Sequence, residues 1–94
     1  MDALELIGSK ARLEILRALT RRDMYVTELR EEVGMDGKTA THHLDVLEGR
    51  GVIESYEDGR RRYYSLVSGL RVEIAPSPNR RFVVQITDGE RADG

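Results

Sequence analysis

The chain contains no cysteine, which excludes disulfide bonds and thiolate metal sites and leaves the packed core as its source of stability. It also lacks an apolar run long enough to cross a bilayer, and its N-terminus has no basic leader followed by an apolar stretch. We therefore expect neither a membrane span nor secretion. These absences together predict a cytoplasmic protein.

The chain also lacks an excess of one charge sign. Fifteen Lys and Arg residues stand against 17 Asp and Glu residues, for a formal net charge of −2. This balance argues weakly against a protein that coats nucleic acid or anionic membranes indiscriminately, but it allows local basic patches. The 94 residues fit one small domain. We predict that this domain spans residues 1–87 and that the polar residues 88–94 form a disordered tail.

In the first half of the chain, hydrophobic residues recur with the period of an α-helix. This pattern predicts helices at about residues 10–19, 27–33 and 36–49. Ser9 and Asp36 are the expected N-caps of the first and third helices, because their side-chain oxygens can accept otherwise unpaired backbone N–H groups. Gly34 is expected to end the second helix, because glycine tolerates a positive φ.

The third predicted helix has one apolar face and one polar face. At about 100° per residue, the buried direction is defined by Ala40, Leu44 and Leu47. The opposite direction is taken by Lys38, His42 and Asp45, with Thr41 on the flank. Because nothing inside a small domain is available to cover this polar face, we expect it to be exposed.

Residues 51–66 predict a β-hairpin. The pair Asp58-Gly59 is typical of a two-residue turn whose central residues take positive φ. With that turn, Ile53 would lie opposite Tyr64. Alternation along the strands points one set toward the core, namely Ile53, Tyr64 and Leu66, and another set outward, namely Glu54, Tyr56, Arg61 and Tyr63.

A second pair of strands is predicted near the C-terminal end. Apolar and polar residues alternate over residues 70–74 and again over 82–86, on either side of a turn-rich Pro-Ser-Pro-Asn segment. The apolar face of this pair would consist of Leu70, Val72, Ile74, Phe82, Val84 and Ile86. Two interpretations stay open: the face could cover the domain's own core, or it could form part of a dimer interface.

Two adjacent histidines, His42 and His43, raise the question of a metal site. Neighbouring residues on a helix diverge by about 100°, whereas metal-ligand pairs on a helix usually stand four residues apart. The chain has no third histidine and no cysteine, so we expect no metal and no cofactor. We expect His42 on the outward face, as a binding residue or as a solvated residue without a task. His43 should be partly covered and should brace the third helix against the hairpin.

The order of helix, helix, tight turn, helix and basic hairpin resembles a winged helix-turn-helix. The amino-acid sequence resembles that of the ArsR-type transcriptional regulators, especially their short archaeal relatives. This likeness is carried by IGSKARLEILRAL (7–19), VTELREEVGMDGKTATHHLDVLEGRGVIE (26–54) and EDGRRRYYSL (57–66). The resemblance implies an α+β fold, with a three-helix core, a β-hairpin wing and, in this chain, a C-terminal pair of β-strands.

In that family the third helix enters the DNA major groove and the wing lies along the adjacent backbone or minor groove. The resemblance thus implies a sequence-specific, double-stranded DNA-binding transcription regulator that occupies a promoter as a homodimer. The residues that it places at DNA are Gly37, Lys38, Thr41 and His42 of the helix and Arg60, Arg61 and Arg62 of the wing. The homodimer would form through the N-terminal segment, the C-terminal strands or both.

Two features depart from the family's pattern. Metal-sensing members carry cysteine clusters, which this chain lacks, so the metal-responsive mechanism is not carried over. Many members dimerise through a helix that follows the wing. Here the corresponding sequence is strand-like and is broken by Pro76 and Pro78, which leaves the dimer interface open.

Two other classes of function compete with this interpretation. A winged-helix module that binds another protein, without specific DNA binding, is suggested by the net acidic charge and the extra apolar strands. An enzyme is not expected. The sequence offers no Ser-His-Asp or Cys-His set and no phosphate-cradling GxxxxGK[ST] loop.

Overall fold

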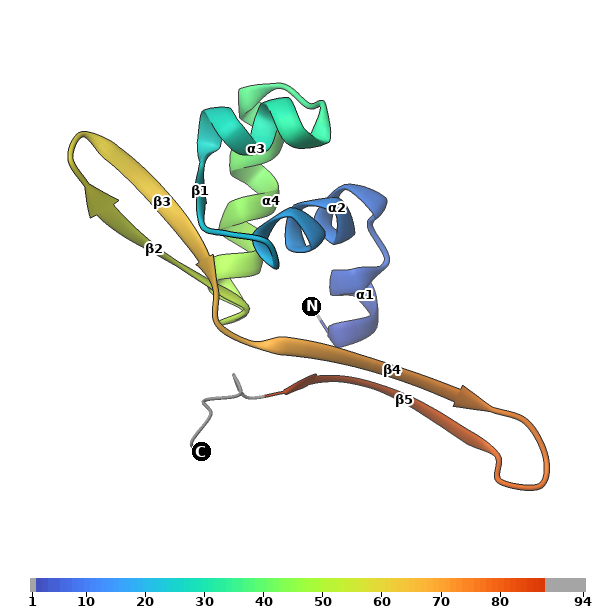
Figure 1. The fold of residues 1–94 in the computed structure, drawn as a ribbon. Coiled ribbons are helices and arrows are strands. Elements are labelled where there is room, and N and C mark those ends of the chain that lie inside the picture. The colour runs from blue at the N-terminus through green and yellow to red at the C-terminus, as the bar shows by residue number, and fades with distance from the viewer. Residues whose placement is uncertain (1, 88–94) are drawn as a thin grey trace.

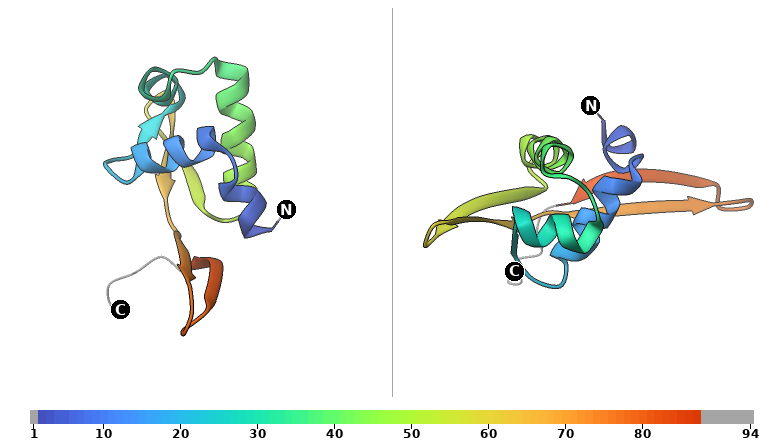
Figure 2. Two further views of the ribbon diagram at one scale, coloured as in Figure 1. Left: turned by 90° about the vertical axis from the view of Figure 1, so that its right-hand side faces the viewer. Right: turned by 90° about the horizontal axis from the view of Figure 1, so that it is seen from above.

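The computed structural model describes residues 2–87, so the predicted tail at 88–94 lies outside the described residues. The elements, in chain order, are α1 (Ala3–Ile7), α2 (Lys10–Leu19), β1 (Met24–Tyr25), α3 (Val26–Val33), α4 (Gly37–Gly49), β2 (Ile53–Asp58), β3 (Arg61–Leu66), β4 (Gly69–Ala75) and β5 (Arg81–Thr87). The helices form a body from which two hairpins project toward opposite ends (Figures 1 and 2). The molecule is therefore elongated, with extents of 53 × 33 × 22 Å.

Local sequence explains where the main helices begin and end. Ser9 caps α2 by accepting the backbone N–H of Arg12 at 3.2 Å, and Asp36 caps α4 by accepting that of Thr39 at 2.8 Å. α3 ends at Gly34, whose φ of 82° lies in the left-handed region. The residues that the sequence selects as helix boundaries therefore hold these places in the structure.

The N-terminal segment forms a short helix, α1, which is not among the three predicted helices. Asp2 and Glu5 close its start with reciprocal hydrogen bonds. Its other end is closed by α2, because the buried Arg12 donates from Nε to the carbonyl of Leu6 at 2.8 Å and from Nη2 to that of Glu5 at 3.0 Å. These bonds satisfy carbonyls that a helix end leaves unpaired, and they fix α1 against α2.

β1, β3 and β2 form one antiparallel sheet, in that order. We call the hairpin β2–β3 the wing. Its turn lies one residue later than predicted, at Gly59-Arg60, because Asp58 pairs with Arg61. Only Gly59 of the predicted turn pair takes a positive φ, 69°, so Asp58 remains in the strand. Each pairing moves by two residues, an even number, and the inward and outward faces of the strands are therefore as predicted.

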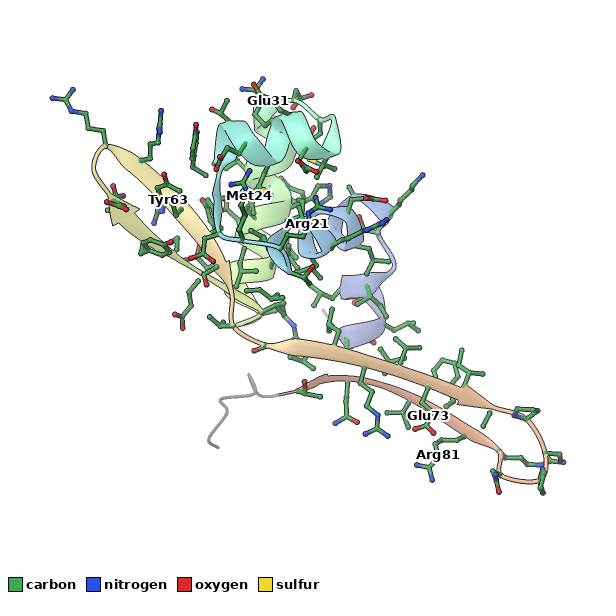
Figure 3. All side chains as sticks on the ribbon, in the orientation of Figure 1. Arg21, Met24, Glu31, Tyr63, Glu73 and Arg81 are labelled. Atoms are coloured by element: carbon green, nitrogen blue, oxygen red, sulfur yellow. The ribbon has the colours of Figure 1, made fainter. Side chains whose placement is uncertain are left out.

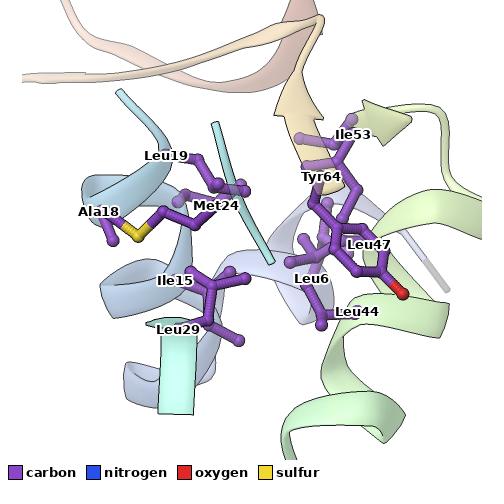
Figure 4. Packing of buried hydrophobic residues seen from close by; sticks show 12 residues of the cluster. Leu6, Ile15, Ala18, Leu19, Met24, Leu29, Leu44, Leu47, Ile53 and Tyr64 are labelled. Carbon is purple, nitrogen blue, oxygen red and sulfur yellow. The ribbon is translucent and has the colours of Figure 1, made fainter. Parts of the chain in front are cut away.

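The core fills the space between the helices and the inner face of this sheet (Figure 4). Its members are Leu6, Ile15, Leu16, Ala18, Leu19, Met24, Leu29, Leu44, Leu47, Val52, Ile53 and Tyr64. The buried direction predicted for α4 is confirmed. Ile53 is buried as predicted but lies opposite Leu66 rather than Tyr64. Met24 belongs to β1, a two-residue strand between the first two predicted helices, where no strand was predicted.

The predicted C-terminal pair of strands is confirmed as the hairpin β4–β5, which we call the arm. Leu70 pairs with Ile86, Val72 with Val84 and Ile74 with Phe82, so the six apolar side chains share one face. Only the root of the arm, Leu70 and Ile86, packs against the core. Together with the three-helix core and the wing, the arm completes the α+β architecture expected from the sequence. Within residues 2–87, no helix is long and apolar enough to cross a membrane.

Candidate nucleic-acid interface

α4 presents the polar face that its sequence predicts. Its inward residues, Ala40, Leu44 and Leu47, have no exposed surface. The exposed residues of the opposite face are Lys38, Thr41, His42 and Asp45. α4 stands at one side of the helical body (Figure 2), and this face is not covered by any of residues 2–87. A ligand from solvent can therefore reach it.

The first turn of α4 gathers positive charge. The backbone hydrogen bond from Thr39, aided by the Thr39 side chain and by the positive charge of Arg30, holds the pKa of the Asp36 carboxyl below its ordinary value. Gly37 follows as the first, half-buried residue of α4. A Cβ at Gly37 would lie 3.6 Å from the Arg30 guanidinium. Arg30 thus adds its charge to the positive end of the helix dipole of α4.

Sequence reasoning missed Arg30, although the signal was present. Arg30 lies in the last turn of α3, and the tight turn after Gly34 brings that turn of α3 beside the first turn of α4. A basic residue just before such a turn is placed next to the start of the following helix, where free N–H groups favour anions. Arg30 therefore belongs to the same surface as Lys38.

The three wing arginines do not share one surface. Arg60 lies in the turn at the tip of the wing, beyond the last pairing of β2 and β3. Arg62 lies on the sheet face that also carries the buried Tyr64 and packs on α4. Arg61 lies on the opposite face, where its guanidinium carbon sits 4.3 Å from the centroid of the Tyr25 ring. Arg62 is therefore the strand arginine on the side of α4.

The outer face of the wing carries an aromatic cluster, Tyr25, Tyr56 and Tyr63 (Figure 3 labels Tyr63). Tyr56 and Tyr63 are stacked, with ring centroids 5.7 Å apart, and Tyr25 meets Tyr63 edge-on at 5.4 Å. Tyr56 donates its O–H to Asp23 Oδ2 at 2.6 Å, and this bond raises the pKa of Tyr56 to about 12. The cluster ties the wing to β1. The sequence indicated that Tyr56 and Tyr63 face outward but not that they meet Tyr25, because β1 was not predicted.

The root of the wing is tied to α4. Ser55 donates its O–H to Glu48 Oε2 at 2.9 Å, and Tyr64 lies beside Leu47 and Leu44 in the core (Figure 4). These contacts set the position of the wing relative to the polar face of α4. One ligand could therefore touch both.

The two histidines have different environments. His42 is exposed, whereas His43 is half-buried with its Nδ1 3.3 Å from Nη1 of Arg12. The sequence predicted that His43 braces α4 against the wing, but its hydrogen-bond partner lies on α2. Because a guanidinium only donates, Nδ1 must accept, and the ring is neutral. Burial, followed by the charges of Arg12 and His42, lowers the pKa of His43. Residues 2–87 hold no group of three or more His, Asp or Glu side chains placed to bind a metal ion.

Comparison with known proteins identifies this arrangement. The helix-turn-helix domain family matches residues 7–56, from the end of α1 into β2. The HTH-type transcriptional regulator NmtR of Mycobacterium tuberculosis is 35% identical over 65 residues, which are 69% of this chain and 54% of that protein. The cadmium resistance transcriptional regulatory protein CadC of Listeria innocua is 31% identical over 61 residues, 64% of this chain and 51% of that protein.

A solved structure is also similar. It is the homodimeric winged helix-turn-helix DNA-binding domain of a possible ArsR-family transcriptional regulator from Mycobacterium bovis. It aligns with a TM-score of 0.64 and 28% identity over 68% of this chain and 59% of that chain. The chain spans about half the length of the curated relatives that it matches, and the arm lies beyond the residues matched by the family. Because that match covers more than half of the 94 residues, the chain belongs to the helix-turn-helix domain family, in its ArsR-type winged form.

Proposed function

We propose that this protein is a cytoplasmic, sequence-specific regulator of transcription that binds double-stranded DNA and occupies a promoter as a homodimer. The observation that carries the proposal is the uncovered polar face of α4, with Arg30 at its start and Arg62 of the wing on its side. The similar proteins support it, since NmtR and CadC are transcriptional regulators. The M. bovis neighbour is a homodimeric DNA-binding domain. We propose no catalytic role.

In this proposal α4 lies in the major groove. Lys38 is placed to reach the O6 and N7 acceptors of a guanine or a nearby phosphate, and Thr41 and His42 can hydrogen-bond base edges. Gly37 has no side chain to keep a phosphate away from the free N–H groups at the start of α4. These residues would supply sequence preference, because contacts to base edges specify and contacts to phosphates position.

The wing supplies the phosphate contacts. Arg60 at the tip and Arg62 on the side of α4 are exposed, and both can follow the DNA backbone beside the groove that α4 occupies. Arg61 contributes charge from the outer face while it covers Tyr25. Each phosphate neutralised should add about −0.9 to the slope of log affinity against log salt.

The test is fluorescence anisotropy with a duplex selected from a random library and with a scrambled duplex. We expect Lys38→Ala to weaken binding to the selected duplex by about 10- to 100-fold, the range for a good base contact, while binding to the scrambled duplex changes little. The matched control is Lys10→Ala, an exposed lysine on α2 and the only other lysine of the chain. Equal losses on both duplexes would show that Lys38 does not read bases.

A second candidate function is a winged-helix module that binds another protein without specific DNA binding. The exposed apolar surface of the arm favours it, because Ile74 and Phe82 are 69% and 65% exposed. The two functions separate on immobilised duplex DNA or heparin. Salt-sensitive retention of the unmodified protein supports DNA binding, and its absence would favour the protein-binding module.

A further inference from the structure

The charged residues Arg71, Glu73 and Arg81 of the arm lie on one face, together with Val83, and six apolar residues lie on the other. On the polar face Glu73 accepts from Arg71 at 2.8 Å and forms an ion pair with Arg81 at 3.6 Å. Glu73 and Arg81 point away from the helical body (Figure 3). The six side chains of the other face are all apolar, and three of them, Val72, Ile74 and Phe82, are 51%, 69% and 65% exposed. These three side chains form the bare part of the face, whereas Leu70, Val84 and Ile86 are half-buried.

The apolar surface continues from the arm onto α2. An open pocket of about 320 Å³ at the root of the arm is lined by Leu13, Leu16, Leu66 and Leu70, with Arg17, Thr20, Ser68 and Gly69 completing it. Leu13 is 46% exposed, although it lies on a helix whose inward residues form the core. A bare apolar tip and an open apolar pocket therefore stand at the two ends of one continuous surface.

We infer that this surface binds the same surface of a second copy, so that the bare parts of two arms meet in antiparallel directions about a twofold axis near Val72. The inference rests on the proposed function, for which it supplies the dimer interface. In this arrangement the tip of each arm, Ile74 and Phe82, lies against the Leu13 pocket beside the root of its partner, because the helices already cover the root residues Leu70 and Ile86. The contact is self-complementary, as a twofold interface requires. The apolar faces of the arms bring no charge into it, and Arg17, the charged residue that lines the pocket, is exposed and can keep its charge in water.

The size of the surface matches this occupant. With about 150–200 Å² for each complete side chain, the exposed parts of Val72, Ile74, Phe82 and Leu13 amount to roughly 400 Å² per copy. Two copies would cover about twice that area from these side chains alone. With flanking atoms, the total comes to about 1,000 Å², the lower bound for a specific interface. A two-stranded hairpin is also only marginally stable in water when neither face is covered, so the outer arm gains stability from its partner.

The first experiment measures the mass of the full chain by sedimentation velocity without DNA. We expect a dimer at micromolar concentration, and we expect Phe82→Asp to raise its dissociation constant at least about 100-fold, because the carboxylate would be buried unpaired. The matched control is Gln85→Asp, an exposed position on the polar face of the same strand, which should remain dimeric. Circular dichroism verifies that both variants keep their helices. A monomeric unmodified chain, or equal dissociation in both variants, would overturn the inference.

The second experiment tests the geometry. Because the chain has no cysteine, one introduced thiol is unique, and a bis-maleimide of about 10 Å can bridge two stacked sheets. We expect Val72→Cys to cross-link to itself, Glu73→Cys to fail, and Ile74→Cys mixed with Leu13→Cys to give a mixed dimer. A dimer that cross-links through Leu4→Cys on α1 and not through Val72→Cys would overturn the arm interface but leave the proposed homodimer intact. Because both readouts omit DNA, they are independent of DNA binding.

Discussion

The wing and the arm are built from strands of similar length, six residues against seven, yet they differ in what covers their faces. The root of the wing's inner face, with Ile53 and Tyr64, is buried in the core, and β1 extends its sheet. Its outer face is occupied by the tyrosine cluster. The arm has no third strand among the described residues, and its outer apolar side chains Val72, Ile74 and Phe82 stay exposed. Alternation in a strand thus predicts an apolar face, but whether that face is covered depends on where the helices stand.

The two hairpins also differ in whether their arginines have ion-pair partners. The wing presents Arg60 and Arg62 to solvent without an ion-pair partner among the residues that the structure describes. The arm pairs Arg71 and Arg81 with Glu73. Unpaired arginines attract a polyanion, whereas paired ones contribute little to a long-range field. The wing is therefore suited to DNA and the arm to an apolar partner.

The largest expected difference between the two hairpins is in unfolding free energy, when one isoleucine in each hairpin is replaced by alanine. Ile53→Ala removes a fully buried side chain at the start of the wing and should cost about 2–5 kcal/mol of unfolding free energy. Ile74→Ala changes a side chain that is 69% exposed and should cost the monomer less than about 0.5 kcal/mol. Urea denaturation at a concentration low enough to keep the chain monomeric measures both.

Protein concentration supplies the control for this pair. Dimerisation stabilises the native state by mass action, so the midpoint of Ile74→Ala should fall below that of the unmodified chain as concentration rises. The urea midpoint of Ile53→Ala should lie well below that of the unmodified chain at every protein concentration. Equal costs for both substitutions in the monomer would mean that the outer arm packs on its own chain.

A smaller difference, in DNA affinity and its salt dependence, is expected between arginines on the two faces of the wing. Arg62→Ala should weaken binding to every duplex by about 10-fold and flatten the salt slope by about 0.9, because it removes one phosphate contact. Arg61→Ala should have a weaker effect of the same kind, since Arg61 lies on the outer face over Tyr25. Anisotropy titrations at several salt concentrations measure both slopes. A larger loss for Arg61→Ala than for Arg62→Ala would reverse the orientation of the wing on DNA.

Much of the fold could be predicted because α2, α3 and α4 carry their own boundary signals, whereas the short α1 was not predicted. Ser9, Gly34 and Asp36 hold the places that their local chemistry indicates. β1 could not be predicted, since a two-residue strand has no period of its own and exists only because β3 pairs with it. The wing turn moved by one residue because the conformation of Asp58 is decided by pairing across the sheet.

The candidate site was predictable only in part, for the same reason. The exposed face of α4 follows from its helical period, and that part of the prediction is confirmed as geometry. The contribution of Arg30, the separation of Arg61 from Arg62 and the link from His43 to Arg12 depend on how elements meet. The DNA contacts of Gly37, Lys38, Thr41, His42, Arg60, Arg61 and Arg62, and the single domain at 1–87, stay predictions.

The smallest expected effect is a loss of stability at low pH that is caused by His43, in the helical body between the two hairpins. The pKa of His43 in the folded chain lies below its ordinary value of 6.5, so the unfolded chain binds a proton first as the pH falls. The contribution of His43 to stability is therefore complete above about pH 6.5 and is lost progressively as the pH falls from there through the folded pKa. Urea midpoints measured between about pH 7.5 and pH 5 should record this loss, and His43→Gln should reduce it.

Glutamine is the informative replacement because its side-chain oxygen can still accept from Arg12 but does not titrate. His42→Gln is the matched control, since His42 is exposed and adjacent, and it should keep the acid sensitivity of the unmodified chain. The loss of stability at low pH should affect the wing and the arm equally. The His43–Arg12 contact joins α4, which carries the wing, to α2, beside which the arm begins. If His42→Gln removes the acid sensitivity and His43→Gln keeps it, the titrating group lies on the exposed face of α4. The contact between α2 and α4 would then not be the acid-sensitive element.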